Sequence, residues 1–191
     1  MNKITKFSKI LTGTCLVLSL NGCGVTESVG GVAVGSWFNN DRRTATAIVD
    51  DQAIAAKANL ALTKDKTLWK DSHISILTYN NSLLLVGQTK NRMYKDQLEK
   101  LVAPISGIGN IYNQVTIGEP IPLKARANDS WITTQVKTKI VSNRDIGINR
   151  VKVITENSTV YLMGMLTADE EKIATDIARR VKGVGKVVTV I

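Results

Sequence analysis

The sequence predicts an α+β protein in which one small unit is used twice. The main observation is a pair of similar β-hairpins, His73–Thr89 and Arg150–Leu166, in which Ile74 matches Val151 at an offset of 77 residues. Each hairpin is followed by a helix-like segment, a Gly-x-Gly turn and a last strand. Repetition on this scale indicates two copies of one structural unit. The predicted architecture is two tandem αββαβ sandwiches, each with its helices on one face of a three-stranded mixed sheet.

The first unit is defined by hydrophobic periodicity and by turn residues. Ile54, Ala58 and Leu62 share one helix face, and the pair Asn80-Asn81 tolerates the left-handed backbone of a tight turn. The predicted elements are a helix opened by Asp41–Thr44, strands His73–Leu77 and Leu83–Gln88, a helix over Asn91–Ile105 and a strand over Ile111–Ile117.

The second unit repeats this plan. Asn128-Asp129-Ser130 is a typical N-cap sequence, and Thr167 to Glu170 has the spacing of a capping box. The predicted elements are a helix over Trp131–Val141, the second hairpin, a helix after Thr167 with Ile173, Ile177 and Val181 facing the core, and a strand over Lys186–Ile191.

The N-terminus has the pattern of an export signal. A lysine-bearing segment precedes an apolar run, Ile10–Leu20, that is too short to span a bilayer. The run ends in Leu20-Asn21-Gly22-Cys23, which resembles a bacterial lipobox. The alternative is an ordinary secretory signal with an unrelated cysteine. The lipobox implies removal of residues 1–22 and a diacylglycerol and an N-acyl chain on Cys23, with no other cofactor expected. Gly24 in place of aspartate implies the outer membrane, facing the periplasm.

Composition divides the rest of the chain. We expect a glycine-rich lipidated tether over residues 23–44, a first domain over 45–118, a short proline-containing linker over 119–123 and a second domain over 124–191. Within the tether, Trp37 and Phe38 could lie at the lipid interface or pack on the first domain, and the sequence does not distinguish these.

Charge gives a weak indication of the partners. The whole chain carries +9, but residues 45–118 hold 8 basic and 6 acidic residues, and residues 119–191 hold 12 basic and 8 acidic residues. The second unit is therefore the more basic, at +4 against +2. This distribution favours anionic partners mildly and lacks the dense basic stripe of a nucleic-acid binder, so no nucleic acid is expected.

Catalytic and metal-binding chemistry is not expected. His73 is the only histidine, and no cysteine or carboxylate cluster accompanies it. The two Gly-x-Gly turns precede strands and not helices, which is unlike a phosphate-binding loop. The sequence therefore predicts a protein that is not an enzyme, with no metal site and no small-molecule substrate.

Trp131 is the anomaly of the second unit. Ile132, Val136 and Ile140 define the core face of its helix, and Trp131 lies about 140° from the middle of that face. Gln135 and Thr138 follow it on the same line, while Lys137 and Lys139 flank that line. Ala53 holds the matching place in the first unit. An exposed tryptophan suits a lipid headgroup interface or a protein partner; the alternative is packing of Trp131 against the first domain or a loop.

Taken together, the repeated hairpins ending at Gly87 and Gly164, the two Gly-x-Gly turns and the cysteine at 23 resemble the BON-domain family. Two BON domains behind a lipobox are similar to the lipid-binding outer-membrane lipoproteins associated with cell division and envelope stress in Gram-negative bacteria. The resemblance implies binding of anionic phospholipids by the second domain, through the helix of Trp131, Gln135, Lys137, Thr138 and Lys139, and a role in envelope integrity. The alternative function is a protein-interaction adaptor for the outer-membrane assembly machinery.

Overall fold

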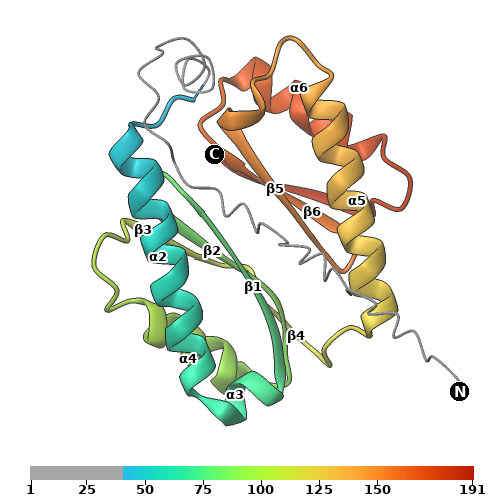
Figure 1. Cartoon of the computed structure of the whole chain (residues 1–191). Coiled ribbons are helices and arrows are strands. Elements are labelled where there is room, and N and C mark those ends of the chain that lie inside the picture. The colour runs from blue at the N-terminus through green and yellow to red at the C-terminus, as the bar shows by residue number, and fades with distance from the viewer. Residues whose placement is uncertain (1–40) are drawn as a thin grey trace, which may run out of the picture.

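The computed structural model describes residues 41–191, which form two domains of the predicted αββαβ type (Figure 1). The α+β fold class is therefore confirmed. The first domain contains α2 (Ala45–Lys64), α3 (Lys66–Lys70), β1 (Ser72–Tyr79), β2 (Ser82–Thr89), α4 (Arg92–Val102), β3 (Asn110–Asn113) and β4 (Thr116–Ile117). Residues 1–40, including Cys23, Trp37 and Phe38, lie outside the described part of the chain.

The first domain differs from its sequence prediction in three details. The short helix α3 was not predicted; its N-cap Asp65 accepts hydrogen bonds from the N–H groups of Thr67 and Leu68. Helix α4 ends at Val102, earlier than predicted, in a turn that contains Pro104. The last strand is split into β3 and β4, because the buried Val115 interrupts the strand and its N–H bonds the Asn113 side chain.

The second domain contains α5 (Leu123–Val141), a 3-10 turn (Ile148–Arg150), β5 (Val151–Glu156), β6 (Thr159–Gly164), α6 (Ala168–Arg179) and β7 (Lys186–Val190). The predicted start of its first helix was wrong. α5 begins at Leu123, directly after Pro122, and not at Trp131. The predicted N-cap Asp129 lies inside the helix, where its carboxylate bonds a distant turn. The capping box of Thr167 and Glu170 on α6 is confirmed.

The two sheets share one topology. In each, the first two strands form an antiparallel hairpin, and the last strand runs parallel to the second strand of the hairpin. Both hairpins close through two residues of positive φ, Asn80-Asn81 and Asn157-Ser158. Two such residues define the type I′ turn, whose twist matches that of the strands.

Glycine is required where the hairpin strands come closest. A Cβ atom on Gly87 would lie 1.8 Å from the carbonyl oxygen of His73, and one on Gly164 would lie 2.1 Å from that of Arg150. No side chain fits at these distances. The glycines that align in the sequence therefore have the same steric role in both domains.

Each domain has its own core between its sheet and its helices. Alternate strand residues point towards the helices, as expected for the period of two in a strand. In the first domain, Leu83 and Leu85 of β2 pack against Ile54 and Ala58 of α2. In the second, Val160 and Leu162 of β6 pack against Ile132 and Val136 of α5.

The opposite faces of the two sheets pack against each other. Tyr79, Leu84 and Val86 of the first sheet form one buried cluster with Tyr161 and Met163 of the second. The layers therefore follow the order helix, sheet, sheet, helix, with α2 and α5 on opposite outer faces (Figure 1). The sequence predicts two units without deciding whether they pack together, and in the structure they share an interdomain apolar core.

Candidate functional site

The outer face of α5 carries three large exposed apolar side chains, one at its start, one near its middle and one at its end. Leu123 is 80% exposed, Trp131 46% and Val141 60%. At 100° per residue, Leu123 and Val141 lie on the same line and Trp131 lies about 80° from them. The line is about 27 Å long, because each residue advances the helix by about 1.5 Å. The three side chains, which form the apolar stripe, are therefore spread over the outward half of α5, and Trp131 is exposed to solvent.

The predicted site residues do not form a single group. Gln135 and Thr138 follow Trp131 along the helix, and Gln135 is partly buried. Thr138 and Lys139 line a shallow depression of about 430 Å³ together with Arg180 after α6. Lys137 lies on the other side of α5, where it lines a cavity between the domains. The structure thus associates Trp131 and Lys139 with one surface and separates Lys137 from it.

Three residues of this surface were missed by sequence reasoning. Leu123 and Lys124 were assigned to the linker and the domain start, because the helix was expected to begin at Trp131. Lys124 lies seven residues before Trp131, or about 20° from its line, and is exposed. Arg180 was not among the predicted site residues. Within the described residues, none of Lys124, Lys139 and Arg180 makes an ion pair.

A buried carboxylate fixes α5 on its sheet. The two oxygens of Asp129 accept hydrogen bonds from the N–H groups of Asn157 (2.8 Å) and Ser158 (2.9 Å), in the β5–β6 turn. Asp51 on α2 makes the equivalent bonds to Asn80 and Asn81, both 2.9 Å. Since these turns leave backbone donors exposed to a buried helix face, a carboxylate there satisfies them and sets the rotation of the helix.

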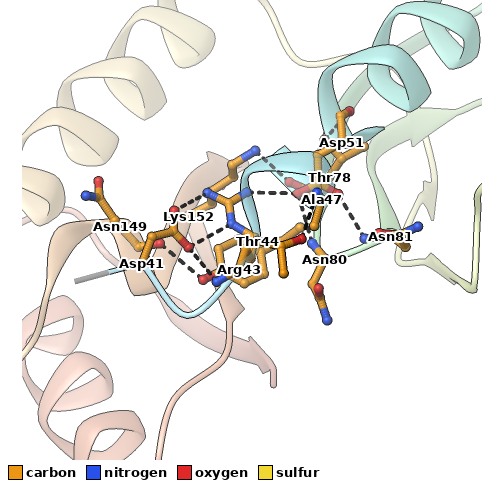
Figure 2. A network of polar contacts seen from close by, with 11 residues as sticks. Asp41, Arg43, Thr44, Ala47, Asp51, Thr78, Asn80, Asn81, Asn149 and Lys152 are labelled. Carbon is orange, nitrogen blue, oxygen red and sulfur yellow. Dashed lines mark hydrogen bonds and ion pairs between the residues drawn. The ribbon is translucent and has the colours of Figure 1, made fainter. Parts of the chain in front are cut away.

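Residues 41–43, at the end of the predicted tether, are fixed by a buried ion network (Figure 2). The Arg43 guanidinium donates to Asp41 (2.8 Å) and to Asp51 (2.8 Å), and its Cζ lies 4.2 Å from the centroid of the Tyr79 ring. Burial alone would raise the pKa of Asp41, but the hydrogen bonds and charge of Arg43 outweigh it and hold that pKa below its ordinary value.

The same segment contacts the second domain. Arg42 donates to the carbonyl oxygen of Met165 (2.7 Å) and forms an ion pair with Glu170 (2.8 Å), which also pairs with Arg150. Burial would raise the pKa of Glu170, but the N–H of Thr167 and the two arginines lower it to about 2. The chain that follows the predicted lipid anchor is thus attached to both domains.

The interdomain cavity has a volume of about 440 Å³ and lies between β1 of the first domain and α5 and β5 of the second. Buried Glu156 lies against it and accepts a hydrogen bond from Gln88 of the first domain (3.0 Å). His73 Nε2 lies 3.6 Å from Glu156. Burial lowers the pKa of His73 and raises that of Glu156, so we interpret this contact as one between a neutral histidine and a carboxyl, and not as an ion pair.

Between Asp41 and Ile191, no group of three or more His, Cys, Asp or Glu side chains could hold a metal ion. Over that range, no helix is both long enough and apolar enough to cross a bilayer.

Comparison with known proteins identifies both domains. The family model of the BON domain matches residues 50–119 and 128–191. The chain is 33% identical over 190 residues to outer membrane lipoprotein DolP of Haemophilus influenzae, covering 100% of this chain and 96% of that protein. It is 37% identical over 151 residues to a 21 kDa hemolysin of Actinobacillus pleuropneumoniae, covering 79% of this chain and 78% of that protein. It is 25% identical over 183 residues to osmotically-inducible protein Y of Escherichia coli, covering 94% of this chain and 88% of that protein.

The family predicted from the sequence is thereby confirmed, and with it the expected location at the outer membrane. Lipidation of Cys23 stays a prediction, since that residue lies outside the described part of the chain. The chain belongs to the BON-domain family of outer membrane lipoproteins.

Proposed function

We propose that the protein binds anionic phospholipid through the outer face of α5 and thereby supports the integrity of the envelope, including at division sites. The observation that carries the proposal is the exposed apolar stripe of Leu123, Trp131 and Val141. Exposed apolar side chains that gather on one face of the molecule mark a site of contact with a membrane or a protein. At a bilayer surface, the same row enters the region between headgroups and acyl chains.

Basic groups beside the stripe account for the preference for anionic lipid. Lys124 and Lys139 project from α5 itself, and Arg180 projects from the turn after α6. Each would contribute about 1 kcal/mol at an anionic surface. Gln135 can donate hydrogen bonds to phosphate oxygens, whereas the Thr138 hydroxyl already donates to the carbonyl oxygen of Thr134 (2.9 Å) and Lys137 lines the interdomain cavity. The first domain has the less basic composition, which favours the second domain as the lipid-binding one.

A lipid anchor on Cys23 would make this contact effectively intramolecular. The tether joins the anchor to the domains, so the local concentration of membrane around α5 is high. A weak surface contact is then sufficient to hold the domain pair on the bilayer. The contact would respond to local lipid composition, while the anchor alone keeps the protein in the membrane.

The alternative is an adaptor for the outer-membrane assembly machinery. It is favoured by the outer face of α2, where Val49 and Leu60 are exposed and separated by 11 residues, or three helical turns. Helix α2 lies on the side of the molecule opposite to α5 (Figure 1). The two functions therefore use different faces and can be tested separately.

Vesicle binding of the chain from Gly24 onward, which contains every described residue, tests the lipid proposal. We expect binding to phosphatidylglycerol vesicles to exceed binding to phosphatidylcholine vesicles. Trp131→Ala should weaken it by about tenfold, because one partly inserted aromatic contributes roughly 1.5 kcal/mol. Sedimentation with vesicles measures both effects.

Trp69→Ala is the matched control. Trp69 on α3 is 46% exposed, the same fraction as Trp131, but lies on the first domain. Its replacement should leave vesicle binding unchanged. Equal losses for Trp69→Ala and Trp131→Ala, or equal binding to the two kinds of vesicle, would exclude α5 as the anionic-lipid surface.

A further inference from the structure

The two domains have equivalent sites at the ends of their shared interface. Asp51 and Asp129 each accept two hydrogen bonds from the hairpin turn of their own domain. Tyr79 and Glu156 are the last residues of β1 and β5 and face the other domain. Tyr79 donates to the carbonyl oxygen of Asn149 (3.1 Å), and Glu156 accepts from Gln88 (3.0 Å).

In the first domain, the chain itself fills this site. The guanidinium of Arg43, two residues before α2, stacks on Tyr79 and donates to Oδ2 of Asp51 (2.8 Å). That oxygen also accepts the N–H of Asn80 (2.9 Å), so it has two donors. Asp41 arrives on the same segment, bonds the guanidinium and is attracted to Lys152 of the second domain (Figure 2). The occupant is therefore an arginine accompanied by a carboxylate.

In the second domain, the equivalent site is the 440 Å³ cavity. The residue two before α5 is Ile121, which cannot supply a guanidinium. Oδ2 of Asp129 accepts the N–H of Asn157 and, among the described residues, no second donor. Glu156 replaces Tyr79, so two buried carboxylates face a space that is large enough for a ligand group. This cavity thus retains the acceptors of the first-domain site without the arginine.

The cavity wall also carries positive groups. Arg126 and Lys137 project from α5 at its two ends, and neither pairs with a carboxylate within residues 41–191. The Arg126 Nε instead donates to the carbonyl oxygen of Ile121 (3.0 Å). A simple cation would be repelled by Arg126 and Lys137, and a simple anion would be repelled by the two carboxylates. A ligand with both charges matches the lining, as the pair of Arg43 and Asp41 does in the first domain.

We propose that this cavity binds an arginine-containing segment of a partner protein, in which an acidic residue lies next to the arginine. The guanidinium would lie between Asp129 and Glu156, and the acidic side chain would face Arg126 and Lys137. Planar guanidinium groups pair with carboxylates through two N–H donors, which gives a defined orientation. The cavity opens beside the interface of the two domains, on the Lys137 side of α5, so a bound segment would not cover Trp131.

The test uses a peptide that copies the occupant of the first-domain site. A fluorescent peptide with the sequence of residues 39–45, Asn-Asn-Asp-Arg-Arg-Thr-Ala, is titrated with the full chain in nonionic detergent, and anisotropy reports binding. We expect saturable binding that weakens at least about tenfold when glutamine replaces both arginines of the peptide. Glu156→Gln and Lys137→Gln in the protein should each weaken it as well. Lys139→Gln, on the other side of α5, should not change the affinity.

Glu156→Gln is chosen over a change at Asp129, because Asp129 also holds the hairpin turn and its loss would destabilise the domain. Equal affinities for wild type and Glu156→Gln, or for the two peptides, would overturn the proposal. Glycerophosphoethanolamine, which also carries one ammonium and one phosphate, is titrated in parallel. Binding of this compound that depends on Glu156, without binding of the peptide, would assign the cavity to a lipid headgroup and reject the partner segment.

Discussion

Asp51 and Asp129 are equivalent buried carboxylates that hold a helix against the turn of a hairpin in each domain. Both lie inside their helices, and both accept two backbone N–H groups from residues of positive φ. The duplicated sequence thus builds the same contact between helix and hairpin turn in both domains. In the first domain Asp51 also accepts a hydrogen bond from Arg43, and in the second domain Asp129 lines the interdomain cavity.

Asp129→Ala should destabilise the second domain strongly. The change leaves the N–H groups of Asn157 and Ser158 without acceptors, at a cost of roughly 1–3 kcal/mol each. We expect the free energy of unfolding, measured with urea, to fall by about 3 kcal/mol. Asp145→Ala is the control, because Asp145 is exposed and its side chain bonds no turn. A change of less than about 1 kcal/mol for Asp129→Ala would contradict the assigned role.

Arg43→Gln should destabilise the protein by about 3–5 kcal/mol, because it leaves the buried carboxylates of Asp41 and Asp51 without their countercharge. Thermal unfolding measures the loss. Arg92→Gln provides the comparison: Arg92 forms a solvent-exposed pair with Asp96 at 3.8 Å, for which about 0.5 kcal/mol or less is expected. Similar losses for the two variants would show that the network of Arg43 is not buried in solution.

The stability of the junction at Glu170 should depend on acidic pH. The pKa of Glu170 is about 2 in the folded protein, against an ordinary value of 4.5. A lowered pKa stabilises the fold above the unfolded value, and this contribution is lost as the pH falls from about 5 towards 2. We therefore expect Glu170→Gln to lower the melting temperature at pH 7 and to have little effect near pH 2. An equal effect at both pH values would contradict the lowered pKa.

Glu156→Gln should raise the melting temperature at pH 7, in contrast to Glu170→Gln. Burial raises the pKa of Glu156 in the folded protein, so the carboxylate is disfavoured there and opposes folding above its unfolded pKa. Glutamine keeps an oxygen to accept the hydrogen bond from Gln88. The variant should melt higher than wild type at pH 7, and the difference should shrink as the pH falls towards the unfolded pKa of 4.5 and be absent near pH 4. A lower melting temperature at pH 7 would show instead that the charged form of Glu156 is stabilised by His73 and Arg126.

Local signals in the sequence predicted much of the fold, and long-range contacts explain what they missed. The turn at Asn80-Asn81 and the capping box at Thr167 depend on neighbouring residues, and these predictions agree with the structure. Asp129 looked like a helix N-cap because an N-cap also uses a carboxylate to bind backbone N–H groups. Its true partners are 28 and 29 residues away, at a separation that local pattern reading does not assess.

The sequence also contains a pattern that indicates the packing of the two sheets. Residues Leu83–Val86 are apolar without alternation, which indicates a strand buried on both faces. One face of this strand packs on α2, and the other packs on Tyr161 and Met163. The face of Trp131, by contrast, followed from helix phase alone, since Ile132, Val136 and Ile140 fix the rotation of α5. The extent of the apolar stripe could not follow, because Leu123 was placed outside the helix.

Ser158→Gly should stabilise the second domain. Ser158 has a φ of 59°, a left-handed conformation that costs an L-residue about 1–2 kcal/mol and that glycine adopts without strain. The side chain of Ser158 makes no hydrogen bond within residues 41–191, and the bonds of its N–H and carbonyl groups remain possible with glycine. After allowance for the larger entropy of glycine in the unfolded chain, we expect a gain of about 0.5–1 kcal/mol in urea unfolding.

Asn81→Gly at the equivalent turn provides the comparison for Ser158→Gly. Asn81 has a φ of 62°, but its side-chain amide donates to the carbonyl oxygen of Gly107 (2.9 Å). Glycine would relieve the backbone and remove this bond, worth about 1 kcal/mol, so the two effects should nearly cancel. The difference between the variants isolates the contribution of the Asn81 side chain, which ties the first hairpin turn to the Gly-x-Gly turn before β3. Equal gains at the two positions would mean that the hydrogen bond from Asn81 contributes nothing to stability.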